Sequence, residues 1–290
     1  MDDFVQKQRD LEHRPEKWIA VFGGKADAIT KGWIIGPDTI SGPMIQHCAG
    51  RMARPGCGLL AALPPRLPAS AGRWQASPGG ARMILIGQYD SPFVRRVGIA
   101  LTLYELPFEH RPWSVFGDAD KIRPYNPLTR VPTLVLDDGL VLVESHGILD
   151  YLDGLVAAER RLFPVTEPAR HRALRVAGLA MGFAEKAVSL FYELKLHQEV
   201  SQVWAERCRA QIIATLSVLE AERSRPSGDD GFAGRIGHAD IAIAVAWRFL
   251  IEAHPGIASA NDYPTLAGEA ARLEALPVFQ AIAQPFIPPA

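Results

Sequence analysis

The chain has 290 residues, enough for one large domain or two ordinary ones, and a formal net charge of −1. This balance gives no electrostatic case for binding nucleic acid or an anionic membrane. The longest apolar runs, such as the one beginning at Ile241, are far shorter than the roughly 20 residues that span a bilayer, so we expect a cytoplasmic protein.

Residues 1–82 differ in composition from the rest of the chain. They carry 11 Lys and Arg against 7 Asp and Glu, and no acidic residue lies between Asp38 and Asp90. Much of this segment is rich in Ala, Pro, Gly and Arg without periodicity, and such a composition buries too little apolar surface to offset its chain entropy. We interpret residues 1–82 as a disordered extension, or as upstream sequence wrongly joined to a protein that begins at Met83.

Residues 83–160 predict an α/β domain. A short apolar strand begins at Met83, and a helix with apolar residues at helical spacing follows Ser91. Residues 107–113 predict an edge strand, and a short helix is expected before the next strand. The Asp-Asp-Gly turn at 137–139 joins two apolar runs into a hairpin.

A further helix is predicted to open with Ser145 as its N-cap, and residues 163–172 to form a linker. Residues 161–290 then predict an all-α domain. Segments 172–195 and 201–223 have apolar residues at i, i+3 and i+4, and the segment 237–253 is apolar on nearly every face, which indicates a helix buried within a bundle.

Four segments give the chain a resemblance to the cytosolic glutathione transferase family, and most of all to its serine-type bacterial and plant branches. They are "YDSPFVRRVGIAL" (89–101), "NPLTRVPTL" (126–134), "DDGLVLVESHGILDYL" (137–152) and "GHADIAIA" (237–244). The resemblance covers residues 83–290. It implies a thioredoxin-like domain that binds glutathione, a helical-bundle domain, and a homodimer pairing unlike domains of two chains. The implied enzyme conjugates glutathione, its co-substrate, to a small hydrophobic electrophile in detoxification.

Ser91 admits two interpretations. With Pro92 at the first helical position, it is a normal helix N-cap. A helix N-terminus also favours an anion, and a serine hydroxyl there can donate a hydrogen bond to a bound thiolate. The family places its catalytic serine here, so the resemblance implies that Ser91 stabilises the thiolate of glutathione. Tyr89 is a competing hydroxyl, and the absence of cysteine at position 91 argues against disulfide exchange.

The resemblance assigns glutathione contacts to two further segments. Val131-Pro132 is implied to be a cis peptide, with the Val131 backbone pairing with the extended peptide ligand and Arg130 reaching its glycyl carboxylate. Glu144 is implied to bind the ligand's ammonium group, while Ser145 and the helix N-terminus bind its γ-glutamyl carboxylate. Gly147 departs from the usual helix former, weakens the helix, and allows close packing.

The helical domain offers weaker signals. Gly237 occupies the cap position of the 238–253 helix with Asp240 three residues later, and His238 is a candidate substitute for the cap. Phe183, Phe191 and Tyr192 are candidates for the wall of the electrophile pocket, although aromatics at helical spacing are more often core. The three cysteines and scattered histidines show no metal-ligand spacing, so no metal is expected.

Two rival functions remain open. The same scaffold could serve a glutathione-dependent reductase, lyase or isomerase, of which a lyase or isomerase need not consume glutathione. It could also serve a non-catalytic binding or regulatory protein, which would bind glutathione without turnover or not at all. The sequence does not identify the electrophile.

Overall fold

The computed structural model describes residues 83–224 and 235–288, so the interpretation of residues 1–82 lies outside the described residues. The first part is a four-stranded mixed sheet in the order β2-β1-β3-β4. Strand β1 runs parallel to β2 and antiparallel to β3, which pairs antiparallel with β4. The strands are β1 (Met83–Ile86), β2 (Phe108–Arg111), β3 (Thr133–Val135) and β4 (Val141–Val143).

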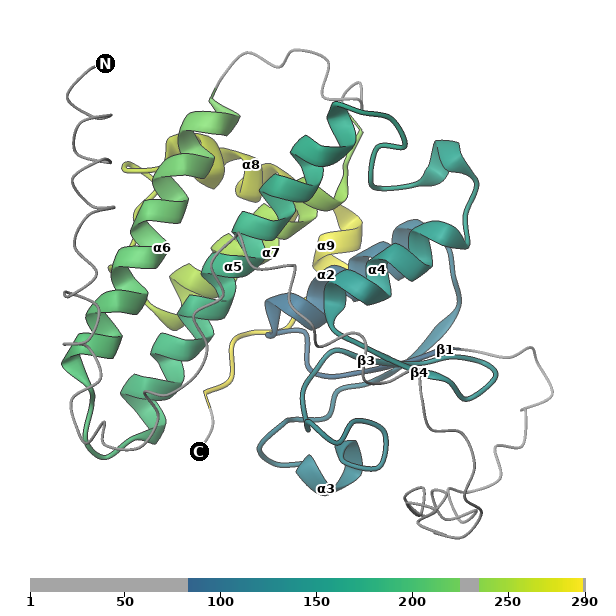
Figure 1. Ribbon diagram of the computed structural model, residues 1–290, viewed down its shortest axis with the longest axis horizontal. Coiled ribbons are helices and arrows are strands. Elements are labelled where there is room, and N and C mark those ends of the chain that lie inside the picture. The colour runs from purple at the N-terminus through teal and green to yellow at the C-terminus, as the bar shows by residue number, and fades with distance from the viewer. Residues whose placement is uncertain (1–82, 225–234, 289–290) are drawn as a thin grey trace, which may run out of the picture. The chain divides into compact units, whose positions relative to one another are not determined.

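Helices cover both faces of this sheet (Figure 1). Helices α2 (Pro92–Leu103) and α4 (Ser145–Gly154) lie on one face and the short α3 (Ala119–Ile122) on the other. Alternate residues of β1 accordingly enter two apolar clusters: Leu85 joins the main core, whereas Ile84 and Ile86 pack with Ile122 of α3. A strand covered on both faces is apolar along its whole length, which explains the run at 83–86.

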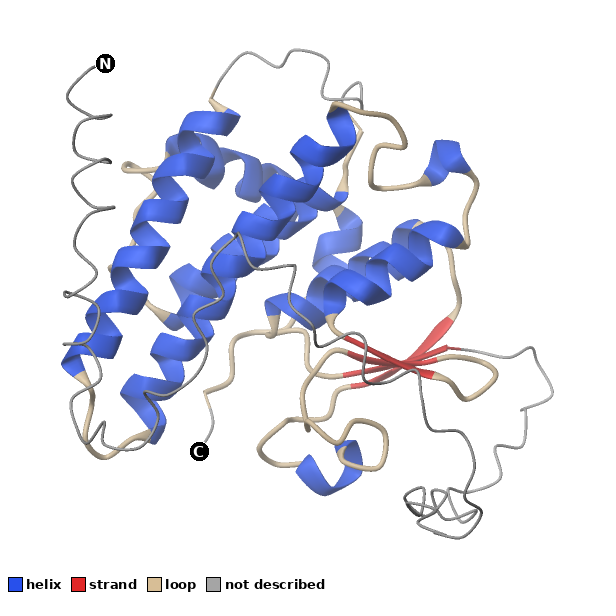
Figure 2. Ribbon diagram, viewed as in Figure 1, coloured by secondary structure: helices blue, strands red, loops and turns tan. Residues whose placement is uncertain are grey.

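The second part is entirely helical within the described residues, and Figure 2 shows the change from sheet and helix to helices alone. The α/β domain followed by a helical bundle is the predicted fold class. A 3₁₀ turn (Ala158–Arg160) leads into α5 (Ala169–Leu196), α6 (Gln202–Arg223), α7 (His238–Ala253), α8 (Pro264–Glu274) and α9 (Pro277–Ala281). Helix α5 begins directly after Pro168, so the last four residues of the predicted linker are helical.

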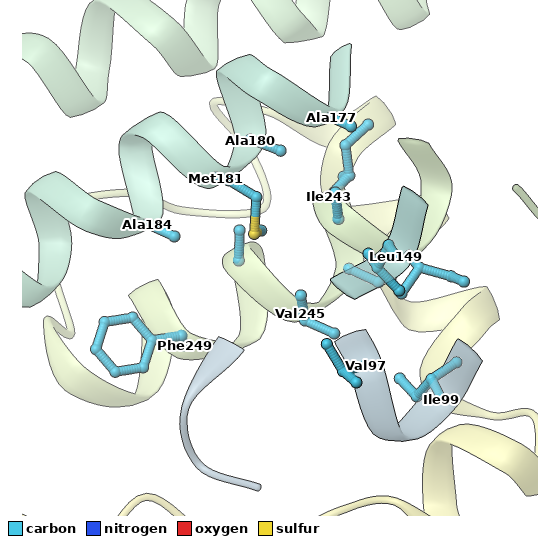
Figure 3. Close-up of a cluster of buried hydrophobic side chains, with 14 of the residues drawn as sticks. Val97, Ile99, Leu149, Ala177, Ala180, Met181, Ala184, Ile243, Val245 and Phe249 are labelled. Carbon is cyan, nitrogen blue, oxygen red and sulfur yellow. The ribbon is translucent and has the colours of Figure 1, made fainter. Parts of the chain in front are cut away.

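Helix α7 is buried among the other described helices, as its all-round apolar pattern predicts. It packs against α5, α8 and α2. Figure 3 shows side chains of α2, α4, α5 and α7 meeting in one cluster, among them Val97, Leu149, Met181 and Val245. The sheet domain and the helical bundle therefore share a continuous core. Among the described residues, no helix combines the length and apolar character needed to cross a membrane.

The start of α7 tests the predicted cap. Gly237 is the N-cap, and its backbone N–H donates to Asp240 Oδ2 at 2.8 Å, as the spacing predicted. His238 does not substitute for a cap. It is fully buried, and its Nε2 lies 3.2 Å from Asp153 Oδ1. At Gly147, an added Cβ would meet nothing within 4 Å, so the suggestion that this glycine allows close packing is wrong.

Two buried histidines predict how stability depends on pH. Burial lowers the pKa of His238 and of His254, whose Nε2 donates to the Ala187 carbonyl at 2.8 Å. Near pH 6.5 the unfolded chain therefore binds protons that the folded chain does not. We expect the free energy of unfolding to fall as the pH is lowered from about 7 to 5.5, by up to about 1.4 kcal/mol per pH unit for each such proton.

Urea unfolding at a series of pH values measures this slope. His254→Gln, which keeps an N–H donor but does not titrate, should flatten it. His171→Gln, which changes an exposed histidine, should leave it unchanged. A pH-independent free energy of unfolding in the native chain, or equal slopes in the two variants, would contradict the expectation.

Candidate functional site

The strand register brings the three predicted site segments to one edge of the sheet. Ile86, the last residue of β1, pairs with Thr133, the first of β3, and Thr133 pairs with Val143, the last of β4. Residues that follow β1, precede β3 and follow β4 must therefore lie together. These segments hold Ser91, Arg130 to Pro132, and Glu144 with Ser145.

Ser91 is the N-cap of α2. Its Oγ accepts a hydrogen bond from the Val94 N–H at 3.4 Å, and Pro92 occupies the first helical position. The cap uses only an oxygen lone pair, so the hydroxyl hydrogen stays available to a group in front of the helix. Ser91 is partly exposed at this end. The capping role and a ligand-binding role are thus compatible in one side chain.

Gly87 sets the separation of the first two segments, and sequence reasoning missed it. Its φ is +131°, and a Cβ on it would lie 2.5 Å from Val94 Cγ2 and 2.8 Å from Val131 Cβ. Only glycine therefore allows α2 and the Val131 segment to approach this closely. A glycine directly after an apolar strand was the available signal.

Side-chain hydrogen bonds hold the segment before β3 in place. Val131-Pro132 is a cis peptide, as predicted. The buried Asn126 donates from Nδ2 to the Arg130 carbonyl at 2.9 Å, and Thr133 Oγ1 donates to the same carbonyl at 2.9 Å. Among the described residues, neither the N–H nor the C=O of Val131 has a hydrogen-bond partner. A partly exposed backbone in this state can pair with an extended peptide.

Glu144, not Ser145, is the N-cap of α4, which corrects the prediction. Glu144 has φ 65° and ψ 120°, a left-handed backbone that turns the chain from β4 into the helix, so Ser145 already has helical geometry. A non-glycine residue in this region is strained, and such strain is concentrated at functional sites. Ser145 is buried, and its hydroxyl has no hydrogen-bond partner within residues 83–224 and 235–288.

Arg130 and Glu144 pair with each other across the site. Arg130 Nη1 lies 3.3 Å from Glu144 Oε1, and both side chains are about 60% exposed. The resemblance implied that they hold opposite ends of one ligand. An ion pair this exposed is worth at most about 1 kcal/mol, so a ligand bearing both charges can displace it.

The aromatic candidates are not equivalent. Phe183 and Phe191 are 2% and 4% exposed and belong to the core, so they do not form a pocket wall here. Tyr89 is also buried, stacked on His110 with ring centroids 3.8 Å apart, and burial raises its pKa to about 12. Among these candidates only Tyr192 is partly exposed. Its ring packs at a right angle to that of Phe116, in the loop after β2, with the ring centroids 5.5 Å apart.

The C-terminal tail contacts the segment before Ser91, which the sequence did not predict. Gln284 Oε1 accepts from the Tyr89 N–H and Asp90 Oδ2 accepts from the Ile287 N–H, both at 3.3 Å. Burial raises the pKa of Asp90, an effect that the Ile287 hydrogen bond partly offsets. Phe286 anchors the tail against Phe191 at 5.0 Å. Figure 1 shows this tail in yellow, running past the start of α2. The apolar residues between prolines in this tail were the only feature of the sequence that could have indicated this contact.

Electrostatically, the site offers two helix N-termini, from α2 and α4, and the exposed guanidinium of Arg130. This arrangement suits a peptide carrying several anionic groups. In the part of the chain that the structure describes, no three His, Cys, Asp or Glu side chains gather as metal ligands would.

Comparisons with known proteins match both parts of the chain. A model of the glutathione S-transferase N-terminal domain matches residues 85–160, and a model of the C-terminal domain matches residues 202–268. The solved structure of a glutathione transferase family member from Pseudomonas fluorescens Pf-5, with bound glutathione, is 31% identical with a TM-score of 0.61. The match covers 70% of this chain and all of that one.

Two relatives extend the comparison. A probable glutathione S-transferase of Oryza sativa subsp. japonica is 28% identical over 66% of this chain and 84% of its own length. A probable maleylacetoacetate isomerase of Drosophila melanogaster is 26% identical over 74% of this chain and 94% of its own length.

Proposed function

Because this chain belongs to the glutathione transferase family, we propose that it binds glutathione along the sheet edge that carries Ser91, Val131 and Glu144, and activates its thiol for conjugation. The observation that carries the proposal is the convergence of these three segments on one register row. This convergence places the unpaired backbone N–H and C=O of Val131 beside the N-termini of α2 and α4.

Glutathione, an extended tripeptide, fits the donors and acceptors of this edge. Its cysteinyl backbone would pair with the N–H and C=O of Val131. Its γ-glutamyl carboxylate would meet the Ser145 hydroxyl and the N-terminus of α4, and its ammonium group would meet Glu144. Its glycyl carboxylate would take Arg130 from the ion pair with Glu144.

This orientation puts the thiol in front of Ser91, as in the serine-type branch. The Ser91 hydroxyl donates a hydrogen bond to the thiolate, and the N-terminus of α2 adds its positive dipole. Both stabilise the ionised sulfur and lower the pKa of the thiol, so more of the nucleophile is present at neutral pH. The sulfur then attacks a small hydrophobic electrophile positioned near Tyr192 and Phe116.

A homodimer is part of the same proposal. Val143, Tyr151 and Leu155 of the sheet domain are partly exposed apolar residues, and so is Leu174 of α5. Gly178 and Gly182 on α5 have open space at the Cβ position. Apolar side chains beside a smooth helix surface suit an interface between unlike domains of two copies.

The Ser91→Ala variant tests the proposal. The ultraviolet absorbance of the thiolate across pH gives the thiol pKa of bound glutathione. We expect the native chain to hold it below the free value of about 8.5 and the variant to raise it by about 1–2 units, the equivalent of losing one charge-assisted hydrogen bond.

Ser201→Ala is the matched control. Ser201 caps α6 with the same geometry, accepting from the Trp204 N–H at 3.4 Å, on a helix that supplies no residue to the proposed site. Both variants lose a cap, but only Ser91→Ala should move the thiol pKa. An unshifted pKa in the native chain, or equal effects of the two substitutions, would leave Ser91 with a capping role alone.

Other glutathione chemistry is the second candidate, favoured by the similarity to the relative named as an isomerase. Product analysis separates the two functions. A transferase consumes one glutathione per product, whereas an isomerase or lyase regenerates it. A chain that binds glutathione without accelerating any such reaction would instead be a binding protein.

A further inference from the structure

Two adjacent arginines on α2 have opposite surroundings. Arg95 is buried with its hydrogen bonds satisfied: it binds both carboxylate oxygens of Glu274, at 2.5 and 2.7 Å, and the carbonyls of Ile282 and Phe279. Arg96 is fully buried, yet its Nε, Nη1 and Nη2 have no hydrogen-bond partner within the described residues. A buried guanidinium normally donates hydrogen bonds to several acceptors, as that of Arg95 does, whereas that of Arg96 has no acceptor among the described residues.

A buried charge without a partner destabilises a fold. Replacing such a group by an apolar side chain of similar volume is often neutral or stabilising. Burial lowers the pKa of Arg96 to about 9, which still leaves it protonated at neutral pH. A buried charge that destabilises the fold is typical of a functional site, so Arg96 is a candidate for a functional role.

The position of Arg96 connects it to the proposed glutathione site. It lies on α2, five residues after Ser91, or about 7.5 Å along the helix axis. Helix α2 packs against α4. Partial desolvation and then the positive charge of Arg96 hold the pKa of His146 below its ordinary value, so the field of Arg96 reaches the residue next to Ser145. Because α2 packs on α4, the N-terminus of α4 lies near a second positive charge, that of Arg96, whose guanidinium has no hydrogen-bond partner among the described residues.

We propose that Arg96 is a positioning residue, whose unpaired buried charge adds to the N-terminus of α4 and strengthens the binding of the γ-glutamyl carboxylate of glutathione without touching it. This inference rests on the proposed glutathione binding. A carboxylate paired with Arg96 would cancel its field, whereas an unpaired charge inside the low-dielectric interior acts over a longer distance. The negative charge that Arg96 lacks within the fold is then that of the γ-glutamyl carboxylate, which it attracts without contact.

Two substitutions separate charge from shape. Arg96→Met keeps most of the side-chain volume and removes the charge, and Arg96→Lys keeps the charge but not the guanidinium geometry. Calorimetry of the full chain would give the Kd for glutathione and for an analogue whose γ-glutamyl α-carboxylate is an amide. Urea unfolding of each variant would give its stability.

We expect Arg96→Met to unfold at the same or a higher urea concentration than the native chain, and to bind glutathione about tenfold more weakly, the effect of about 1.4 kcal/mol. It should bind the amide analogue as the native chain does. Arg96→Lys should restore most of the affinity for glutathione. A merely structural role for Arg96 predicts instead that Arg96→Met loses stability and that both ligands are affected alike.

Three results would overturn the inference. One is native affinity for glutathione in Arg96→Met, and another is an equal loss for glutathione and the amide. The third is a native chain that binds no glutathione, in which case the proposed function fails as well. If Arg96→Met does not fold, Arg96→Lys decides: weak glutathione binding by this folded, charged variant would overturn the inference.

Discussion

Replacing Asp153 by alanine is expected to lower the free energy of unfolding by about 3–5 kcal/mol. Asp153 is buried near the end of α4 and accepts hydrogen bonds from the backbone N–H groups of Leu162 and Phe163, at 3.1 and 3.2 Å. It also accepts from the hydroxyl of Tyr104 and from Nε2 of His238. A carboxylate only accepts, so the His238 hydrogen must lie on Nε2.

The size of this effect follows from what alanine would leave behind. Three buried donors would lose this acceptor together: the hydroxyl of Tyr104, which follows α2, Nε2 of His238 on α7 and the backbone N–H of Phe163. The Leu162 N–H would keep only its bond to the Tyr104 oxygen, at 3.1 Å. Each unsatisfied donor costs about 1–3 kcal/mol. Although burial alone would raise it, hydrogen bonds from His238 and Tyr104 hold the pKa of Asp153 below its ordinary value. This contribution to stability is therefore complete above about pH 4 and is lost as the pH falls further.

Urea unfolding at pH 7 measures the loss, and Asp150→Ala is the matched control. Asp150 lies one turn earlier on the same helix and is exposed. Its substitution should change stability by no more than about 0.5 kcal/mol. Similar losses from the two substitutions would mean that the buried cluster contributes nothing beyond the helix itself.

Most of the fold could be predicted because its signals are local. The Asp-Asp-Gly turn between apolar runs predicts the β3–β4 hairpin, and apolar spacing predicts α2, α5, α6 and α7. The boundaries shifted where a local rule had an exception. Ser145 is a good N-cap residue, but the left-handed backbone of Glu144 moved the cap one position earlier, and no propensity predicts such a conformation for glutamate.

The site was less predictable from the residues themselves. The grouping of Ser91, Val131 and Glu144 came from the family resemblance, and its physical cause is the register of β1, β3 and β4. Phe183, Phe191 and Tyr192 have the same helical spacing whether they face a core or a pocket, so only the packed structure separates them. The tail contacts join residues about 195 positions apart and leave no local pattern.

Arg95 and Arg96 show the same limit most clearly. They are chemically identical neighbours, but one residue around a helix is a rotation of about 100°, and this rotation takes Arg95 to Glu274 and leaves Arg96 buried without a hydrogen-bond partner among the described residues. The sequence shows two arginines within an amphipathic helix. The sequence cannot show that Arg95, and not Arg96, pairs with the carboxylate of Glu274, which lies 179 positions later in the chain.

Replacing Arg95 by methionine is therefore expected to lower the free energy of unfolding by about 3–5 kcal/mol, whereas the same change at Arg96 should not lower it. The variant would leave the Ile282 and Phe279 carbonyls without their donor and reduce Glu274 to its contact with Arg248 at 3.1 Å. These bonds hold α8, α9 and the tail onto α2, so the Tyr89–Asp90 segment should loosen as well.

A double-mutant cycle isolates the ion pair. Arg95→Met, Glu274→Gln and the double variant, compared by urea unfolding, should give a coupling energy of about 2 kcal/mol or more, because both partners are largely buried and joined by two parallel bonds. Hydrogen exchange of the Tyr89 and Ile287 amides, whose acceptors belong to the tail contact, should rise in Arg95→Met. Equal stability of Arg95→Met and Arg96→Met would mean that the four hydrogen bonds of Arg95 add nothing to the burial of its side chain.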